Sequence, residues 1–205
     1  TTFYFKNKEK QHGINNFIVS TSSDAGEGEH KLFGYIRNNR ASHSNQVTMI
    51  YGLDADLIML ALNHLPISKQ IYLYRETPEF IKSLNRDLEP GEPYFLDIPK
   101  LAQTIRLDMT GTSVISKKQE SNRLYDYIFL CFFLGNDFMP HFPSLNIRTG
   151  GIHVILAAYK NLFRKSNNNL TNGKIIYWHN VKKLVEYLAE AEYQNLVKEY
   201  NLRAK

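Results

Sequence analysis

The sequence is poor in cysteine and has no long hydrophobic run. Its 205 residues include a single cysteine, Cys131, so an internal disulfide is excluded. Cys131 lies inside the apolar residues 128–134, which favours a small core side chain over a nucleophile. No apolar run approaches the roughly 20 residues of a membrane-spanning helix, and no secretory signal opens the chain. These absences favour an intracellular protein, cytoplasmic rather than nuclear, with no membrane partner, and they leave the oligomeric state open.

The chain also lacks an initiator methionine, and its polar, basic residues 1–15 suggest a fragment or a trimmed chain. What is present favours a folded protein, with 43% hydrophobic and 13% aromatic residues. This length suits one α/β domain with a full core. We therefore expect a single domain over 1–205, with a sheet portion at 1–109 and a helical portion at 120–205. The net charge of +5 and the pI near 9.1 suit a polyanionic partner.

Five carboxylates in three short clusters give the most specific signal. Two clusters have an acid-x-acid spacing and follow apolar runs that are typical of buried strands, whereas the third follows a Gly-Asn pair. The acids are Glu27 and Glu29 after residues 17–20, Asp54 and Asp56 after residues 47–51, and Asp137 after residues 135–136. Open α/β sheets bind their ligands outside the carboxyl ends of the strands, where these acids are expected.

Each acid alone has a simpler interpretation. Glu27 and Glu29 suit the first turn of a helix, Asp54 suits a helix N-cap, and Asp137 suits a turn. Acids that converge at one sheet edge, however, repel one another unless a multivalent cation lies between them. Because all the ligand atoms would be oxygens, the clusters together predict a site for Mg²⁺ or Mn²⁺ rather than for zinc.

The hydrophobic pattern predicts a sheet followed by helices. We expect strands at 17–20, 47–51 and 71–75 that alternate with helices at 27–39 and 55–64. Such βαβαβ order predicts a parallel sheet with right-handed crossovers. The remaining expected elements are an extended piece at 94–96, helices at 99–108, 123–134, 151–164 and 179–199, a mobile basic loop at 110–122 and an Asn-rich loop at 166–173.

Longer segments around the acids resemble the Xrn family of 5′→3′ exoribonucleases. They are GEGEHK at 26–31, YGLDADLIML at 51–60 and FLCFFLGNDFMPHFPSL at 129–145. The resemblance runs in order through most of the chain. It implies an α/β fold related to the flap endonucleases and PIN-like nucleases, with a central parallel sheet flanked by helices and a mostly helical C-terminal half.

The resemblance also implies a chemistry. It places Glu27, Glu29, Asp54, Asp56 and Asp137 in the family's acidic site, where two Mg²⁺ or Mn²⁺ ions act in hydrolysis. The implied substrate is single-stranded RNA with a 5′-monophosphate. Four basic side chains near the acids are candidates for contacting that RNA, namely His30, Lys31, Arg37 and Arg40. The simpler alternative is that they form a solvent-exposed helix face without a ligand.

The family pattern is incomplete in this sequence. Two further aspartates and the 5′-phosphate pocket of the family belong to an N-terminal segment, and nothing before Phe17 matches them. The chain therefore resembles the C-terminal portion of the conserved nuclease core, and we expect it to be inactive or weakly active alone. Two alternatives remain open from the sequence: a flap-type structure-specific endonuclease, and a non-catalytic RNA-binding or scaffold fragment.

Overall fold

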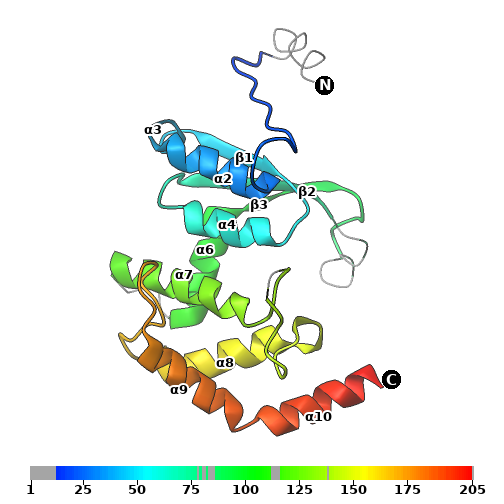
Figure 1. Cartoon of the computed structure of the whole chain (residues 1–205), viewed down its shortest axis with the longest axis vertical. Coiled ribbons are helices and arrows are strands. Elements are labelled where there is room, and N and C mark those ends of the chain that lie inside the picture. Colours follow the sequence, from blue (N-terminus) through cyan, green and yellow to red (C-terminus); the bar gives the residue numbers. More distant parts are fainter. Residues whose placement is uncertain are drawn as a thin grey trace.

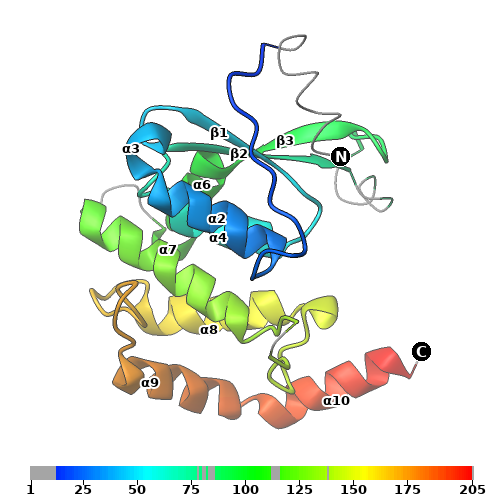
Figure 2. The same cartoon turned by 45° about the horizontal axis from the view of Figure 1, so that its top comes forward.

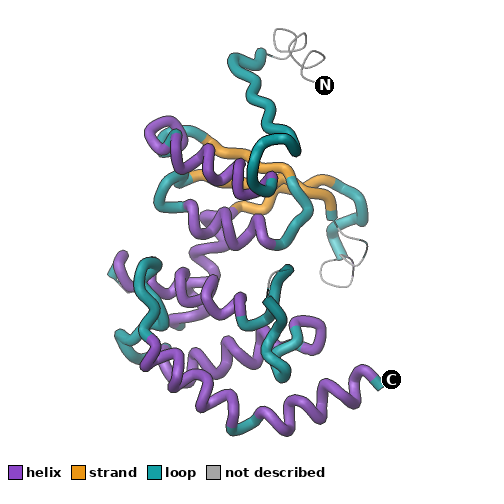
Figure 3. The backbone as a smooth tube through the Cα atoms, in the orientation of Figure 1, coloured by secondary structure: helices purple, strands orange, loops and turns teal. Residues whose placement is uncertain are grey.

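Figure 1 shows the computed structural model of the chain, which describes residues 13–77, 79, 82, 86–111, 116–137 and 139–204. A small sheet with its flanking helices forms one end of the molecule, and a stack of helices forms the other. All the strands lie in the first of these parts (Figure 3). None of the helices in the described ranges is both long and apolar enough to cross a membrane.

Within the described residues, the sheet has three strands in the order β1-β2-β3. β1 (Val47–Tyr51) pairs in parallel with β2 (Gln70–Glu76), and β2 pairs in antiparallel with β3 (Pro93–Asp97). Side chains alternate between the two faces, so Ile50 and Leu73 are buried on one face while Tyr51 is 62% exposed on the other. The sheet is therefore covered by helices on one face only within the part of the chain that the structure describes.

Helices α4 (Asp56–His64) and α6 (Ile98–Thr110) cover the buried face of the sheet. Asp97 begins α6, because its side chain accepts a hydrogen bond of 2.9 Å from the backbone N–H of Lys100. Helix α2 (Gly28–Asn38) packs on α4, and the short α3 (Arg40–His43) leads from α2 into β1. These connections place the N-termini of α2 and α4 at the same end of the sheet portion.

The helical part begins with α7 (Lys117–Phe132), which packs on α4, α6 and α8. The 3₁₀ turn η2 (Ile147–Thr149) leads into α8 (Gly151–Phe163), and α9 (Trp178–Ala189) packs on α8. Figure 2 shows α7 crossing between the sheet portion and α8, while α10 (Glu192–Arg203) extends away from the body beyond α9. Helix α7 thus joins the two parts, and α6 also packs directly on α8.

A buried polar network ties α7 to α8 and to the loop after it. Arg123 and Asp126 of α7 are both fully buried, and Tyr159 of α8 donates a hydrogen bond to the carboxylate of Asp126. The other carboxylate oxygen accepts bonds of 2.8 Å from the backbone N–H groups of Leu170 and Thr171. The guanidinium of Arg123 donates to three backbone carbonyl oxygens, those of Phe163, Ser166 and Asn168. These bonds compensate much of the cost of burying two charges, although Nε of Arg123 has no hydrogen-bond partner among the described residues.

The structure confirms the α/β class and most of the expected elements, with four corrections. Residues 17–20 form no strand, because no described strand lies beside them to accept their hydrogen bonds. The sheet is mixed rather than parallel, because β3 returns as a hairpin partner of β2. The expected loop at 110–122 is wrong from residue 117 onward, where α7 begins after the N-cap Ser116. The expected helix at 179–199 is broken at residues 190–191.

Part of the expected lead-in at 1–15 lies outside the described residues.

Candidate metal centre

The N-terminus of α2 carries the first two acids. Glu27 is the N-cap residue of α2, but its side chain accepts no capping hydrogen bond. The imidazole Nδ1 of His30 lies 3.6 Å from a carboxylate oxygen of Glu27 and 4.0 Å from one of Glu29. One ligand atom from each of these three residues falls within 4.8 Å of the others. The arrangement gathers one imidazole and two carboxylates at the start of the helix.

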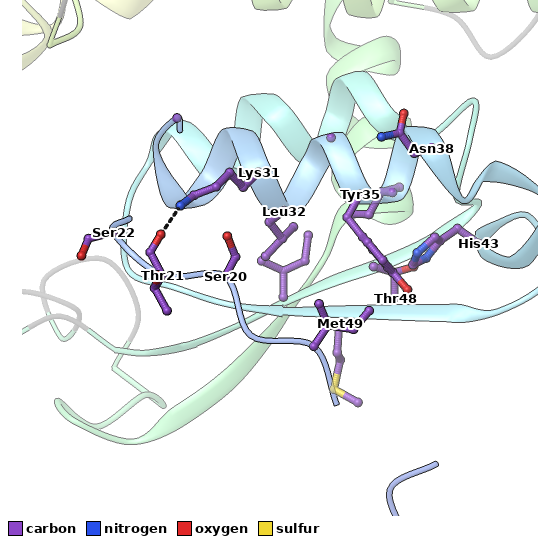
Figure 4. A pocket seen from close by; sticks show the side chains of 16 residues that line it. Ser20, Thr21, Ser22, Lys31, Leu32, Tyr35, Asn38, His43, Thr48 and Met49 are labelled. Carbon is purple, nitrogen blue, oxygen red and sulfur yellow. Dashed lines mark hydrogen bonds between the residues drawn. The ribbon is translucent and has the colours of Figure 1, made fainter. Parts of the chain in front are cut away.

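Lys31 holds the loop that precedes α2. Its ammonium donates a hydrogen bond of 2.7 Å to the carbonyl oxygen of Thr21 (Figure 4). It donates a second one, of 3.1 Å, to the carbonyl oxygen of Asp24. The carboxylate of Asp24 in turn accepts bonds from the Ser20 hydroxyl and the Thr21 N–H, and these bonds lower its pKa. Lys31, a candidate for RNA contact from the sequence, therefore has a structural role in fixing this loop.

The second pair of acids lies in the loop between β1 and α4. The Gly52 N–H donates to the Tyr74 carbonyl oxygen at 3.2 Å, and Arg75 donates to the carbonyl oxygen of Leu53. One carboxylate oxygen of Asp54 accepts the backbone N–H of Asp56 at 3.2 Å. The N-cap residue of α4 is Ala55, so Asp54 does not occupy the N-cap position that its simpler interpretation requires.

Asp137 lies in a tight loop after α7. Gly135 has a φ of +83°, and a Cβ atom there would lie 2.7 Å from the backbone nitrogen of His141. The side chain of Asn136 accepts the Met139 N–H at 2.8 Å, and the Asn136 N–H donates to the Met139 carbonyl oxygen at 2.9 Å. The loop is thereby closed, with the exposed Asp137 at its turn.

Electrostatic coupling shows which acids lie near one another. Burial raises the pKa of Glu29, and the negative charges of Asp54 and Asp56 raise it further. Burial likewise raises the pKa of Asp56, with added contributions from Asp54 and Asp137. The structure thus brings acids from three separate segments into one electrostatic group, which Glu27 joins through its effect on Glu29.

A hollow of about 190 Å³ adjoins these acids. Glu29, His30 and Asp56 form its polar wall, together with Asn136. Cys131 also lines it, but burial raises the pKa of its thiol to about 11, so the thiol is neither an anionic ligand nor a nucleophile near pH 7. The expectation of an inert cysteine agrees with this geometry.

A larger hollow of about 1100 Å³ lies on another side of α2, between residues 18–22, α2 and β1 (Figure 4). Its lining includes Lys31, Tyr35 and Met49 but none of the five acids. We therefore place the candidate site at the smaller hollow, where the charged oxygens are.

The donor set fits a hard divalent cation. The charges of Asp54 and Asp56 act on Glu29, and those of Asp54 and Asp137 act on Asp56; among the effects on Glu29 only His30 opposes the rise in pKa. Acids that repel one another in this way are stabilised when a multivalent cation lies between them. Oxygen ligands of this kind suit Mg²⁺ or Mn²⁺.

Two of the four basic candidates lie at the other end of α2. Arg37 places a guanidinium nitrogen 3.0 Å from Nε2 of His64, on α4. Burial lowers the pKa of His64, so its neutral ring accepts this bond while Nδ1–H donates to the Leu60 carbonyl oxygen. Arg37 is about 12 Å along the helix axis from Glu29, from a rise of 1.5 Å per residue. Arg40 begins α3, still further along the chain.

Asn136 is a residue of the site that the sequence analysis did not single out. It lines the hollow and shapes the loop of Asp137. The available signal was its position between Gly135 and Asp137, because an Asn before an exposed acid often closes a turn with its side chain.

Two family descriptions match the chain, one in its N-terminal part and one in its C-terminal part. Residues 2–77 match the "XRN 5'-3' exonuclease N-terminus", and residues 117–204 match the "Xrn1 helical domain". The two matches bracket the acids, with Glu27, Glu29, Asp54 and Asp56 in the first and Asp137 in the second. The chain belongs to the Xrn family.

Curated relatives agree with this assignment to the Xrn family. The chain is 32% identical to "5'-3' exoribonuclease 2" of Arabidopsis thaliana, over 86% of this chain and 21% of that protein. It is 32% identical to the protein of the same name from Gallus gallus, over 85% of this chain and 22% of the relative. It is 29% identical to the protein of the same name from Saccharomyces cerevisiae, over 85% of this chain and 19% of that relative. The chain thus spans about a fifth of the length of these Xrn relatives.

Proposed function

We propose that this chain supplies the acidic metal centre of a 5′→3′ exoribonuclease. The observation that carries the proposal is the mutual repulsion of Glu29, Asp54 and Asp56, extended by Asp137, beside one hollow. Membership of the Xrn family and the names of its relatives support hydrolysis of RNA as the reaction. The proposed substrate is single-stranded RNA that carries a 5′-monophosphate.

Two divalent ions, Mg²⁺ or Mn²⁺, would lower the pKa of a bound water and stabilise the leaving oxygen of the phosphodiester. The side chains of this chain supply the rest. Glu29 and Asp56 line the hollow and would be the central ligands, while Asp54 and Asp137, whose charges act on Asp56, would complete the oxygen set. Glu27, with His30 beside it, borders this set at the start of α2.

The proposed centre is incomplete in this chain. The family pattern includes two further aspartates and a 5′-phosphate pocket that no residue before Phe17 matches. Mg²⁺ gives up its waters reluctantly, so a partial set of carboxylates should hold it only at about millimolar concentration or above. We therefore propose that residues 1–205 alone show little cleavage, and that any cleavage lacks 5′→3′ polarity.

The test is cleavage of end-labelled RNA by the natural gene product that contains this chain. We expect degradation of 5′-monophosphorylated RNA to require Mg²⁺ or Mn²⁺ and to stop with EDTA. Asp54→Ala and Asp56→Ala should each lower the rate by roughly 100-fold or more, because stabilisation by the metal is worth several kcal/mol. Asp108→Ala is the matched control. Asp108 is an exposed acid of α6 that pairs with Lys160 of α8 and does not line the hollow.

Wild-type rates in Asp54→Ala and Asp56→Ala would assign these acids to structure. They would favour the non-catalytic RNA-binding alternative. Internal cuts at branched duplexes, in place of release from a 5′ end, would favour the endonuclease alternative.

A further inference from the structure

A second hollow adjoins the one beside the acids. This second hollow, of about 370 Å³, lies between α4, α7 and the turn at residues 171–176. The two hollows share four lining residues, which are Met59, Leu60, Ile128 and Phe132. The two neighbouring hollows are together called the seam groove here, with Glu29 and Asp56 at one end and Lys174 and Ile176 at the other.

Helix periodicity aligns the residues that line the seam groove. On α4, Asp56, Met59 and Asn63 recur at the spacing of one helix face, and on α7 Phe132, Ile128 and Tyr125 do the same. Along α4 the sequence runs away from the acids, and along α7 it runs back toward them. Each stripe covers eight residues, and its seven steps of 1.5 Å give a length of about 10 Å. The groove therefore leads directly out of the candidate metal centre.

The far end of the seam groove is rigid and positively charged. The Asn172 side chain accepts the N–H groups of Lys174 and Ile175 at 3.0 and 2.9 Å. The Thr171 N–H is anchored on the buried carboxylate of Asp126. The exposed Lys174 thus projects from a fixed turn, and no carboxylate in the described part of the chain forms an ion pair with its ammonium.

We propose that the seam groove holds the nucleotides next to the phosphate that is bound at the metal centre. Their bases would lie against Phe132 and the apolar wall behind it, and a backbone phosphate would meet Lys174. This inference rests on the proposed function. Aromatic side chains stack on any base, which suits an enzyme that must accept every sequence. A carboxylate-metal end and a lysine end match the alternating sites that a polynucleotide offers, whereas an apolar protein helix would leave both ends unused.

The experiment measures binding of a fluorescent 5′-monophosphorylated oligouridylate to the full chain, with EDTA present so that the metal centre does not contribute. Phe132→Ala should weaken binding roughly fivefold or more, since stacking of a base is worth about 1–3 kcal/mol. Lys174→Ala should weaken binding and reduce the slope of log affinity against log salt by about 0.7, the value for one phosphate contact on a single strand. Both side chains are exposed, so the fold should survive.

Matched controls lie far from the groove. Leu107→Ala removes a 51% exposed apolar side chain of α6, and Lys69→Ala removes an exposed lysine before β2; neither should change the affinity. Equal affinities for wild type, Phe132→Ala and Lys174→Ala would overturn the proposal, as would the absence of any binding by the wild-type chain. Loss in Phe132→Ala with an unchanged affinity and salt slope in Lys174→Ala would also overturn it, because the lysine end of the groove would then meet no phosphate.

The same two variants separate this proposal from the proposed function. If both groove variants of the natural gene product cleave RNA with metal and with wild-type kcat/KM, the proposed metal centre stands and the proposed groove is refuted. Conversely, if RNA binding needs Phe132 and Lys174 while Asp54→Ala cleaves normally, the proposed groove stands and the proposed metal centre is refuted.

Discussion

At the residue scale, Glu29 and Asp56 show how burial and neighbouring charge act together. Both raise the pKa of each carboxyl group, so these acids hold their protons at a higher pH than ordinary carboxylates do. A bound cation competes with those protons. Metal affinity at this site should therefore fall as the pH is lowered, and it should begin to fall at a higher pH than for isolated acids.

Asp54→Asn tests the coupling between these acids. The substitution removes a negative charge that raises the pKa of both Glu29 and Asp56, so both pKa values should decrease. Titration of side-chain carboxyl carbons by NMR measures the change. Asp108→Asn, which neutralises an acid elsewhere on the surface, should leave both values unchanged. Unaltered values in Asp54→Asn would show that the charge of Asp54 does not contribute to the shifts.

At the element scale, the position of Asp137 depends on the loop after α7. Gly135→Ala would force a side chain into a backbone conformation with φ of +83° and into contact with the backbone of His141. We expect a loss of about 1–3 kcal/mol and displaced NMR signals for residues 136–142. Gly91→Ala is the control, because Gly91 has a φ of +77° but open space around it. Equal effects of the two substitutions would show that crowding at His141 is unimportant.

The network around Asp126 should give the fold a pH dependence. Burial raises the pKa of Asp126 to about 6, against hydrogen bonds that favour the carboxylate. The folded pKa lies above the unfolded value of 3.8, so this group stabilises the fold most below about pH 4, and that contribution is lost as the pH rises through 6. The change is on the order of 3 kcal/mol.

Urea unfolding of the wild type and of Asp126→Asn between pH 4 and 7 measures this contribution. Other carboxylates affect both proteins equally, so the difference in unfolding free energy isolates Asp126. We expect the wild type to lose stability relative to Asp126→Asn as the pH rises through this range. A constant difference would mean that the hydrogen bonds from Tyr159 and the backbone keep the carboxyl group ionised throughout.

Local signals predicted most elements but not those that depend on distant partners. The run 47–51 has β-branched and aromatic residues and forms β1 at those bounds. The run 17–20 has a similar composition, yet a strand also needs a neighbour, which the described residues do not provide. The break at residues 190–191 lies in a pattern that continues on both sides, so apolar spacing alone did not reveal it.

At the scale of the whole molecule, one face of the sheet carries a row of exposed apolar side chains. Met49 is 64% exposed and Phe95 is 57% exposed, and the rings of Tyr51, Tyr74 and Phe95 form a continuous row across the three strands. β1 is also an edge strand. Parallel strands usually have both faces covered, and open edges and apolar patches promote association.

We therefore expect the isolated chain to bind the dye ANS and to self-associate. Met49→Lys should reduce both effects, because it places a charge on this face of β1, next to the row of rings. Leu107→Lys, at a position of similar exposure on α6, should have little effect. Dye fluorescence and sedimentation velocity measure the two quantities. A monomeric wild type without dye binding would show that this face is well solvated.

The family and the acidic segments could be predicted from the sequence because they are local and ordered along the chain. The seam groove could not be predicted, because the sequence alone does not distinguish Met59 and Phe132 from ordinary core residues. Their role depends on α4 and α7 lying side by side. Lys31 and Arg37 could not be assigned either, since their partners are a loop carbonyl and a histidine on another helix.

The central claim is that acids from three segments of this chain bind divalent cations together. Titration of the isotope-labelled chain with Mn²⁺, followed by paramagnetic broadening of NMR signals, tests it most directly, because broadening reports weak binding as well as tight binding. We expect the signals of Glu29, Asp54, Asp56 and Asp137 to broaden first and together, and Asp54→Asn to weaken the effect at all four. Broadening confined to one segment, or spread evenly over exposed acids such as Asp108, would contradict a shared centre.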